Sequence, residues 1–154
     1  EALFHRCCLN GNPSYFRMTD FCNKHDVPVE FAKAAVIKRG RKATVVTFAE
    51  MLDDVIEACM DLDVTILYYT TAAPFDYSTL RSCIVNHKIF ICQPFYEGTF
   101  YADMLLAAKG LDVDIDGIGV TLEVLRTYGT KREKDIQLGL SAAGIKKRLC
   151  DFIN

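Results

Sequence analysis

The 154-residue sequence predicts an α/β fold of three layers, with a mainly parallel central sheet of five or six strands. Apolar segments rich in β-branched and aromatic residues alternate with amphipathic segments through most of the chain. The two strongest strand candidates, residues 64–70 and 89–95, contain no charged side chain, which favours strands buried on both faces. Strands that alternate with helices in this way become parallel and are covered by helices on both sides.

The length and composition are typical of one globular domain, which we expect to span residues 1–154. The net charge of -2 gives no overall attraction to nucleic acid or to an anionic membrane. The longest uncharged stretch, residues 64–75, is too short to span a bilayer. Seven cysteines, most of them in apolar runs, predict free thiols in an intracellular, reducing compartment.

The first 40 residues are predicted to form a strand at residues 2–9, a helix from Ser14 to about His25 and a second helix that ends at Gly40. An Asn-Gly-Asn-Pro turn separates the strand from the first helix. Asp26 is a good N-cap for the second helix, and Pro28 fits its first turn because its missing N–H is not needed there.

The middle of the chain predicts three strand and helix pairs: 43–46 with 47–61, 64–70 with 76–87, and 89–95 with 98–109. Thr47 and Glu50 have the spacing of a capping box. Asp76 or Ser78 can cap the next helix. Pro94 is expected to end its strand, because proline cannot donate a hydrogen bond to a neighbouring strand.

The last third begins with an acidic segment in which Asp112, Asp114 and Asp116 alternate with aliphatic residues. An extended strand would place the three carboxylates on one face. Two glycines then break the alternation, and a helix is predicted for residues 120–128. Residues 135–141 alternate as a strand would, although the two alanines that follow also allow a helix. We favour a strand, a turn at 142–144 and a final amphipathic helix.

The acidic segment allows three interpretations. The first is a strand with a solvated acidic face. The second is a calcium loop, because Asp112, Asp114, Asp116, Gly117 and Glu123 match D-x-[DN]-x-[DN]-G-x5-E, although aliphatic residues stand where such a loop would be polar. The third is a cluster of the three aspartates that binds Mg²⁺ or Mn²⁺ at a shared pocket on the sheet's carboxyl edge.

Two further sets of residues are candidate binding groups. Cys22 and His25 have the spacing of a zinc-ligand pair, but the second cysteine pair of a zinc site is missing. The candidate nucleic-acid-binding residues are basic: Lys38, Arg39, Arg41, Lys42, Lys131 and Arg132. The first four flank Gly40 and form either a solvated turn or a contact for phosphate groups.

The order of segments resembles the NYN branch of the PIN-like ribonuclease domains. The similar segments are ALFHRCCLNG, TILYYTTAAP, IFICQPF, KGLDVDI and DIQLGLSAAG. The resemblance implies a Rossmann-like fold in which aspartates at strand ends hold a divalent metal that activates water for phosphodiester cleavage. Only Asp112 matches the family's acidic positions; Arg6 and Cys7, and Ala142 and Ala143, stand where other acids are expected.

The resemblance therefore implies an RNA-associated domain with weakened or absent nuclease activity. The alternative is a non-catalytic, Rossmann-like protein-interaction module within a larger protein or complex, and the absence of any complete catalytic motif favours it. A third hypothesis, a nucleotide enzyme that uses the loops after Leu9, Thr70 and Phe95, has no glycine-rich phosphate motif to support it. RNA or a protein is accordingly the expected partner.

Overall fold

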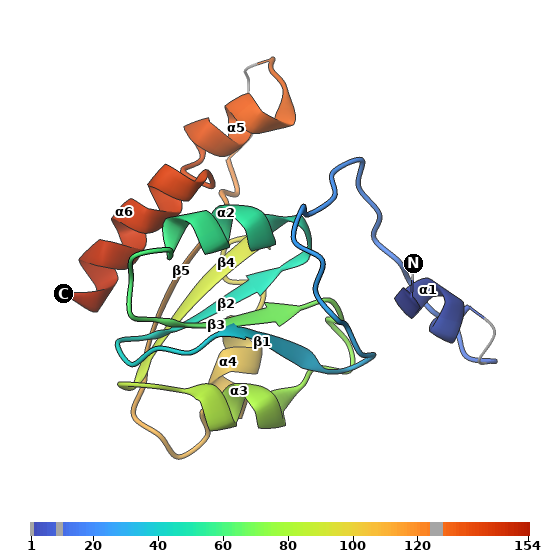
Figure 1. The fold of residues 1–154 in the computed structure, drawn as a ribbon, viewed down its shortest axis with the longest axis horizontal. Helices are drawn as coiled ribbons and strands as arrows, with labels where there is room; N and C mark the ends of the chain where they lie inside the picture. Colours follow the sequence, from blue (N-terminus) through green and yellow to red (C-terminus); the bar gives the residue numbers. More distant parts are fainter. Residues whose placement is uncertain (1, 9–10, 124–127) are drawn as a thin grey trace.

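A five-stranded, mostly parallel sheet lies between two layers of helices in the computed structural model, which describes residues 2–8, 11–123 and 128–154 (Figure 1). The strands are β1 (Ala34–Lys38), β2 (Thr44–Phe48), β3 (Thr65–Tyr69), β4 (Lys88–Tyr96) and β5 (Asp114–Val120). Their order across the sheet is β1-β3-β2-β4-β5. Strands β2 to β5 are parallel, whereas β1 pairs antiparallel with β3. The three-layer α/β fold expected from the sequence is confirmed, with five strands.

Two helices cover each face of the sheet (Figure 1). On one face lie α2 (Leu52–Ala58), which follows the 3-10 turn η1 (Ala49–Met51), and α6 (Ala142–Ile153). On the other face lie α3 (Tyr77–Cys83) and α4 (Tyr101–Ala107). Two short helices, α1 (Ala2–Cys7) and α5 (Lys131–Gln137), lie outside these layers.

The core has two halves, one on each side of the sheet, because successive side chains of a strand point to opposite faces. Phe90 of β4 packs with Ile145 and Leu149 of α6 on one side. Ile91, the next residue, packs on the other side with Leu80 of α3 and neighbouring residues. Every residue of β2 and β3 is buried, which explains why these segments carry no charged side chain.

The strands and helices expected between residues 43 and 109 are present. The carboxylate of Asp76 accepts the backbone N–H of Thr79 at 3.1 Å and caps α3, as the sequence indicates. Thr47, in contrast, is a residue of β2, and η1 begins after Phe48 without a side-chain cap. Pro94 does not end β4: the pairing with β5 shifts register between Cys92 and Tyr96, so the strand continues past the proline.

The predictions for the first 40 residues are wrong at three places. Residues 2–7 form helix α1 instead of a strand, and α1 lies apart from the sheet (Figure 1). Residues 14–25 are not helical. Some of their backbone N–H groups donate to a distant residue instead of to a helical carbonyl: Asp53 accepts those of Lys24 and His25. The expected second helix is replaced in its second half by strand β1.

Gly40 shows why a helix does not precede it. Its N–H donates to the hydroxyl of Thr65, which in turn donates to the Gly40 carbonyl. A Cβ atom at Gly40 would lie 2.3 Å from the backbone nitrogen of Val64. The glycine therefore permits close approach of two backbone segments and does not terminate a helix.

The last third also departs from expectation. Gly117 and Gly119 lie within β5, so the acidic segment is not a calcium-binding loop. Residues 120–123 are not helical, and residues 124–127 of the helix expected there lie outside the described residues. Residues 131–137 form α5 instead of the strand we favoured, because Thr130 and Glu133 form a capping box. The final amphipathic helix, α6, is confirmed.

All seven cysteines are free, five of them at least partly buried. None of the described helices is long and apolar enough to cross a membrane.

Candidate functional site at the carboxyl edge of the sheet

A cavity of about 390 Å³ lies at the edge where the parallel strands end. We call it the carboxyl-edge cavity. Pro94 of β4 and Val120 of β5 contribute apolar surface, and α5 closes one side. Ligands of open α/β sheets gather at this edge, because the loops after the strands project there. Its charged lining consists of three cations and three carboxylates: Arg17, Lys131, Lys134, Glu50, Asp54 and Asp135.

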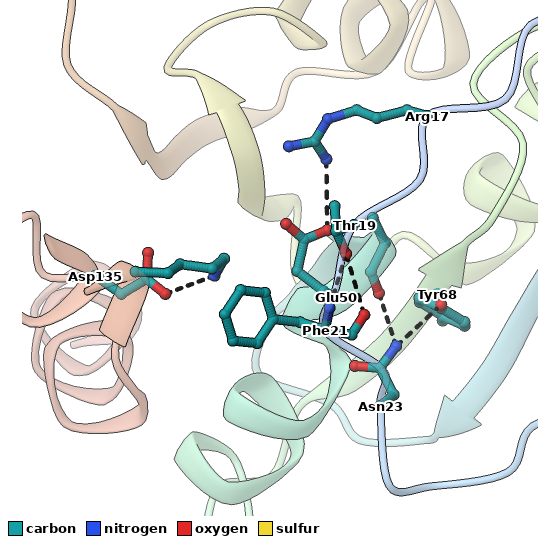
Figure 2. A network of polar contacts seen from close by, with 9 residues as sticks. Arg17, Thr19, Phe21, Asn23, Glu50, Tyr68 and Asp135 are labelled. Carbon is teal, nitrogen blue, oxygen red and sulfur yellow. Dashed lines mark hydrogen bonds and ion pairs between the residues drawn. The ribbon is translucent and has the colours of Figure 1, made fainter. Parts of the chain in front are cut away.

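Residues 11–33, here called the N-terminal arm, reach this edge and are fixed there by side-chain hydrogen bonds (Figure 2). The Nδ2 atom of Asn23 donates to the carbonyl of Ala49 at 2.8 Å and to the Tyr68 hydroxyl at 3.2 Å. Nη1 of Arg17 lies 3.4 Å from Oε2 of Glu50, and the guanidinium stacks over the ring of Phe95. The arm is therefore part of the cavity wall.

Asp53, on α2, holds the next part of the arm. Its carboxylate accepts the N–H of Lys24 at 2.6 Å and the N–H of His25 at 3.3 Å, and it lies 2.6 Å from Nδ1 of the His25 ring. Burial raises the pKa of Asp53, but these hydrogen bonds outweigh burial and hold the pKa below its usual value. The Asp53 carboxylate therefore stays charged and keeps its hydrogen bonds to the arm.

Helix α5 contributes a second ion pair. Nζ of Lys131 lies 2.6 Å from Oδ2 of Asp135 and also lies over the ring of Phe21 from the arm. Figure 2 shows Phe21 and Asp135 on this side of the site. Asp54, across the cavity on α2, is partly buried, and burial together with the nearby Asp135 charge raises its pKa. The cavity thus brings charged groups from the arm, α2 and α5 together.

Arg148 of α6 forms a separate ion cluster with Asp116 and Glu97. Its Nη2 lies 2.8 Å from Asp116 Oδ1 and 3.2 Å from Glu97 Oε1. Burial raises the pKa of Asp116, but the Arg148 guanidinium and the backbone N–H of Gly117 together outweigh burial, so the pKa lies below its usual value. The cluster ties α6 to β5 and to the residue that follows β4.

The three aspartates proposed as metal ligands do not converge. Asp112 precedes β5, and Asp114 is its first residue, so both lie at the amino edge of the parallel strands, opposite to the expected pocket. Both are exposed, and Asp116 is engaged by Arg148. Among the described residues, no group of three or more His, Cys, Asp or Glu side chains could hold a metal ion. The geometry therefore supports neither a Mg²⁺ or Mn²⁺ site at the three aspartates nor a zinc site at Cys22 and His25.

The six basic residues proposed for nucleic acid do not form one surface. Lys38 to Lys42 connect β1 to β2 at the amino edge, whereas Lys131 and Arg132 lie on α5 near the carboxyl edge. Most of the first group is already engaged. Nζ of Lys38 donates to three carbonyls after α2, Arg39 contacts the sulfur of Cys83, and Arg41 pairs with Asp63. Lys131 is paired with Asp135.

Sequence reasoning missed the cavity-lining residues Arg17, Glu50, Asp54, Lys134 and Asp135. Glu50 carried a usable signal, because it lies two residues after the end of a buried parallel strand, where functional side chains gather. The others gave no signal, because Arg17 comes from an irregular segment and the remaining three lie on helices whose packing the sequence does not reveal.

Comparison with known proteins shows which proteins this chain is similar to. No family model matches the chain. A solved structure described as "Split gene transketolase, inactive beta4 tetramer" has the same fold, with a TM-score of 0.70 and 14% identity over 83% of this chain and 43% of its own.

Two curated relatives make the comparison more specific. An uncharacterised 33.6 kDa protein of the fasciation locus of Rhodococcoides fascians is 29% identical over 90% of this chain. The 1-deoxy-D-xylulose-5-phosphate synthase of Pseudoalteromonas translucida is 27% identical over 82% of it. The chain spans 46% of the length of the first relative and 21% of the second.

These relatives overturn the resemblance to PIN-like nucleases. They point to the transketolase and deoxyxylulose-phosphate synthase group, and the predicted RNA-associated, nuclease-like function is wrong. Of these segments, only TILYYTTAAP and IFICQPF contain buried parallel strands, which many α/β folds share. ALFHRCCLNG begins in α1 and DIQLGLSAAG begins in α5, so they do not form the strands that the resemblance implies. The relatives fit the alternative, a module within a larger protein or complex, better.

Proposed function

We propose that the chain is a non-catalytic protein-interaction module of an enzyme related to transketolase and to 1-deoxy-D-xylulose-5-phosphate synthase. One observation carries the proposal. The similarity covers 82% of this chain but only 21% of the synthase, so the chain corresponds to one segment of a larger enzyme. A segment of this kind contributes to assembly through its surface, while the rest of the enzyme supplies the reacting groups.

The described residues do not by themselves make up a cation site for the cofactor of this group. Enzymes of the group use thiamine diphosphate with a divalent cation. Among the described residues, no group of three or more His, Cys, Asp or Glu side chains could hold a metal ion. The carboxyl-edge cavity contains as many carboxylates as cations, so it gives a diphosphate no net attraction. We assign no catalytic step to this chain.

Calorimetric titration of the purified chain with thiamine diphosphate and Mg²⁺ tests this assignment. We expect no heat of binding at cofactor concentrations that saturate the full-length synthase of Pseudoalteromonas translucida, which serves as the positive control. Saturable binding with a micromolar Kd would contradict the proposal, because it would place a complete cofactor site within this chain.

The exposed apolar residues beside the cavity support an interface there. Tyr15 and Met18 of the arm are 91% and 83% exposed, and Leu122, two residues after β5, is 83% exposed. Arg17 and Val120 line the same cavity, and each of the three apolar residues lies within two positions of one of them in the sequence. Large apolar groups gathered on a surface mark interaction sites.

We propose that a second copy of this chain binds to that region. The structural neighbour with the same fold is described as a β4 tetramer, which is an assembly of identical chains. Most oligomers of soluble proteins are likewise built from identical subunits. Tyr15, Met18 and Leu122 would become buried at the contact between two copies.

A further inference from the structure

The N-terminal arm is held by polar contacts and leaves large apolar side chains exposed to solvent. Residues 11–33 contain no helix or strand, and none of them is buried. The Nδ2 atom of Asn23 donates inwards to the Tyr68 hydroxyl at 3.2 Å (Figure 2). Tyr15 and Met18, in contrast, are 91% and 83% exposed. Because burial of apolar groups is the main source of folding stability, this orientation does little to stabilise the arm itself.

A small number of contacts hold the arm on the rest of the chain. Asp53 of α2 accepts the N–H groups of Lys24 and His25 and lies 2.6 Å from the His25 ring. Arg17 lies 3.4 Å from Glu50, at the edge of the sheet (Figure 2). A segment with few buried apolar contacts opens at a low cost in free energy. Release of the arm therefore requires less free energy than unfolding of the sheet.

Docking of the arm decides where its exposed apolar residues lie. Arg17, which stands between Tyr15 and Met18 in the sequence, lines the carboxyl-edge cavity. Val120 lines the same cavity and precedes the exposed Leu122 by two positions. In a released arm, Tyr15 and Met18 would no longer be fixed relative to Leu122. A surface made of both parts of the chain therefore exists only while the arm is docked.

We propose that docking of the arm controls self-association: two copies associate only while their arms are docked, and association in turn holds the arms in place. This control rests on the proposed self-association and adds the conformation that it requires. Coupling between two equilibria is reciprocal, so docking and association strengthen each other equally. Since two identical copies each contribute an arm, a change in docking acts twice on the dissociation constant.

Two substitutions in the body of the protein release the arm without altering its outer surface. Asp53→Ala removes the acceptor for the N–H groups of Lys24 and His25, and Tyr68→Phe removes the hydroxyl that accepts from Asn23. Sedimentation equilibrium of the whole chain measures self-association. We expect the dissociation constant to rise by about tenfold or more for Asp53→Ala and by about threefold or more for Tyr68→Phe.

Matched controls separate release of the arm from loss of stability. Tyr69, the next residue of β3, is also buried, and its hydroxyl donates to the Asp76 carbonyl at 2.8 Å. Tyr69→Phe should therefore lower stability but leave the dissociation constant unchanged. Glu57→Ala on α2 and Asp20→Ala on the arm itself, both at exposed positions, should associate as the unmodified chain does. Circular dichroism confirms that each variant is folded.

Hydrogen exchange provides a readout that a purely structural role of Asp53 would not change. In the unmodified chain, the N–H groups of Lys24 and His25 should exchange about fivefold more slowly at concentrations where the chain is associated than where it is single. The double variant Met18→Ser, Leu122→Ser keeps the contacts that dock the arm but should remain single. Its exchange at the same two positions should not depend on concentration.

The possible outcomes distinguish control by the arm from the self-association on which it rests. A single-chain mass of the unmodified chain at every concentration would refute both. Self-association with the same dissociation constant in the unmodified chain, Asp53→Ala and Tyr68→Phe would refute only control by the arm. Equal weakening by Tyr68→Phe and Tyr69→Phe would also refute it, because association would then follow stability alone. Tighter association of Asp53→Ala would show that the docked arm blocks the interface.

Discussion

The ammonium group of Lys38 lies 2.6 Å from the carbonyl oxygen of Leu62 and 2.8 Å from that of Cys59. It also lies 3.4 Å from the carbonyl oxygen of Met60. These carbonyls belong to the turn that follows α2, where the backbone has lost its helical donors. Lys38, which the sequence suggested as a phosphate contact, therefore reaches from β1 and stabilises the end of α2.

Replacing Lys38 should consequently affect stability. We expect Lys38→Met to lower the free energy of unfolding by about 1–3 kcal/mol, because it leaves partly buried carbonyls without a charged donor. Urea denaturation provides the measurement. Lys42→Met is the matched control, since Lys42 is exposed and its substitution should change stability by less than about 0.5 kcal/mol. Equal effects of the two variants would contradict this role of Lys38.

Asp76 should confer a stability that depends on acid pH. Its carboxylate accepts the N–H and hydroxyl of Thr79, the Ser78 hydroxyl and the N–H of Ala34 in β1. Burial raises the pKa of Asp76, but these donors outweigh it and lower the pKa to about 2. The pKa is lower in the folded state than in the unfolded state, so the stabilisation is present above about pH 4 and is lost as the pH falls towards 2.

We expect Asp76→Asn to lower the free energy of unfolding by about 1–3 kcal/mol at neutral pH, since the amide cannot accept all four hydrogen bonds. Unfolding measured from pH 6 to pH 2 should show the difference between the unmodified chain and the variant shrinking below pH 4. A difference that stays constant over this range would show that the charge of Asp76 does not contribute.

Gly119 should tolerate no larger side chain. A Cβ atom there would lie 2.8 Å from the Cα and N atoms of Glu97 and from the carbonyl oxygen of Phe95. Gly119→Ala would force β5 away from the end of β4, which should cost about 1–3 kcal/mol or more. Thermal unfolding is the measurement, with Thr121→Ala, at an exposed position just beyond β5, as the near-neutral control. An unchanged Tm for Gly119→Ala would refute the close approach.

Asp53 should control the mobility of the N-terminal arm. Asp53→Ala removes the acceptor for the N–H groups of Lys24 and His25, so we expect their protection from hydrogen exchange to fall by about fivefold or more. Hydrogen–deuterium exchange measured by mass spectrometry reports this directly. Glu57→Ala, at an exposed position on the same helix, should leave the arm unchanged. Comparable protection in both variants would mean that other contacts hold the arm.

The parts of the fold that the sequence predicted correctly are those whose local pattern and tertiary role agree. Strands β2 and β3 and the central part of β4 are buried on both faces, so these segments carry no charged side chain. Asp76 caps α3 through a local hydrogen bond that the sequence spacing alone indicates. These features need no knowledge of distant segments.

The errors occur where distant contacts decide the structure. The arm is extended because Asp53, almost 30 positions further along, accepts its N–H groups. In the sequence, Gly119 looks like a residue that would interrupt a strand. In the structure it is part of β5, where the absence of a side chain allows the backbone of Glu97 to pass close by. The alternation correctly predicted a strand, which contains Asp114 and Asp116. The direction of β5, however, puts Asp112 and Asp114 at the edge of the sheet opposite to the cavity.

Sedimentation equilibrium of the purified chain tests the central claim, which is that this 17.3 kDa chain is an assembly module. We expect a mass of at least two chains at micromolar concentration, and a shift towards the single-chain mass when Met18 and Leu122 are both replaced by serine. Tyr96→Ser, at an exposed aromatic residue that does not line the cavity, is the control and should not change the mass. A mass of 17.3 kDa for the unmodified chain at every concentration tested would contradict the account.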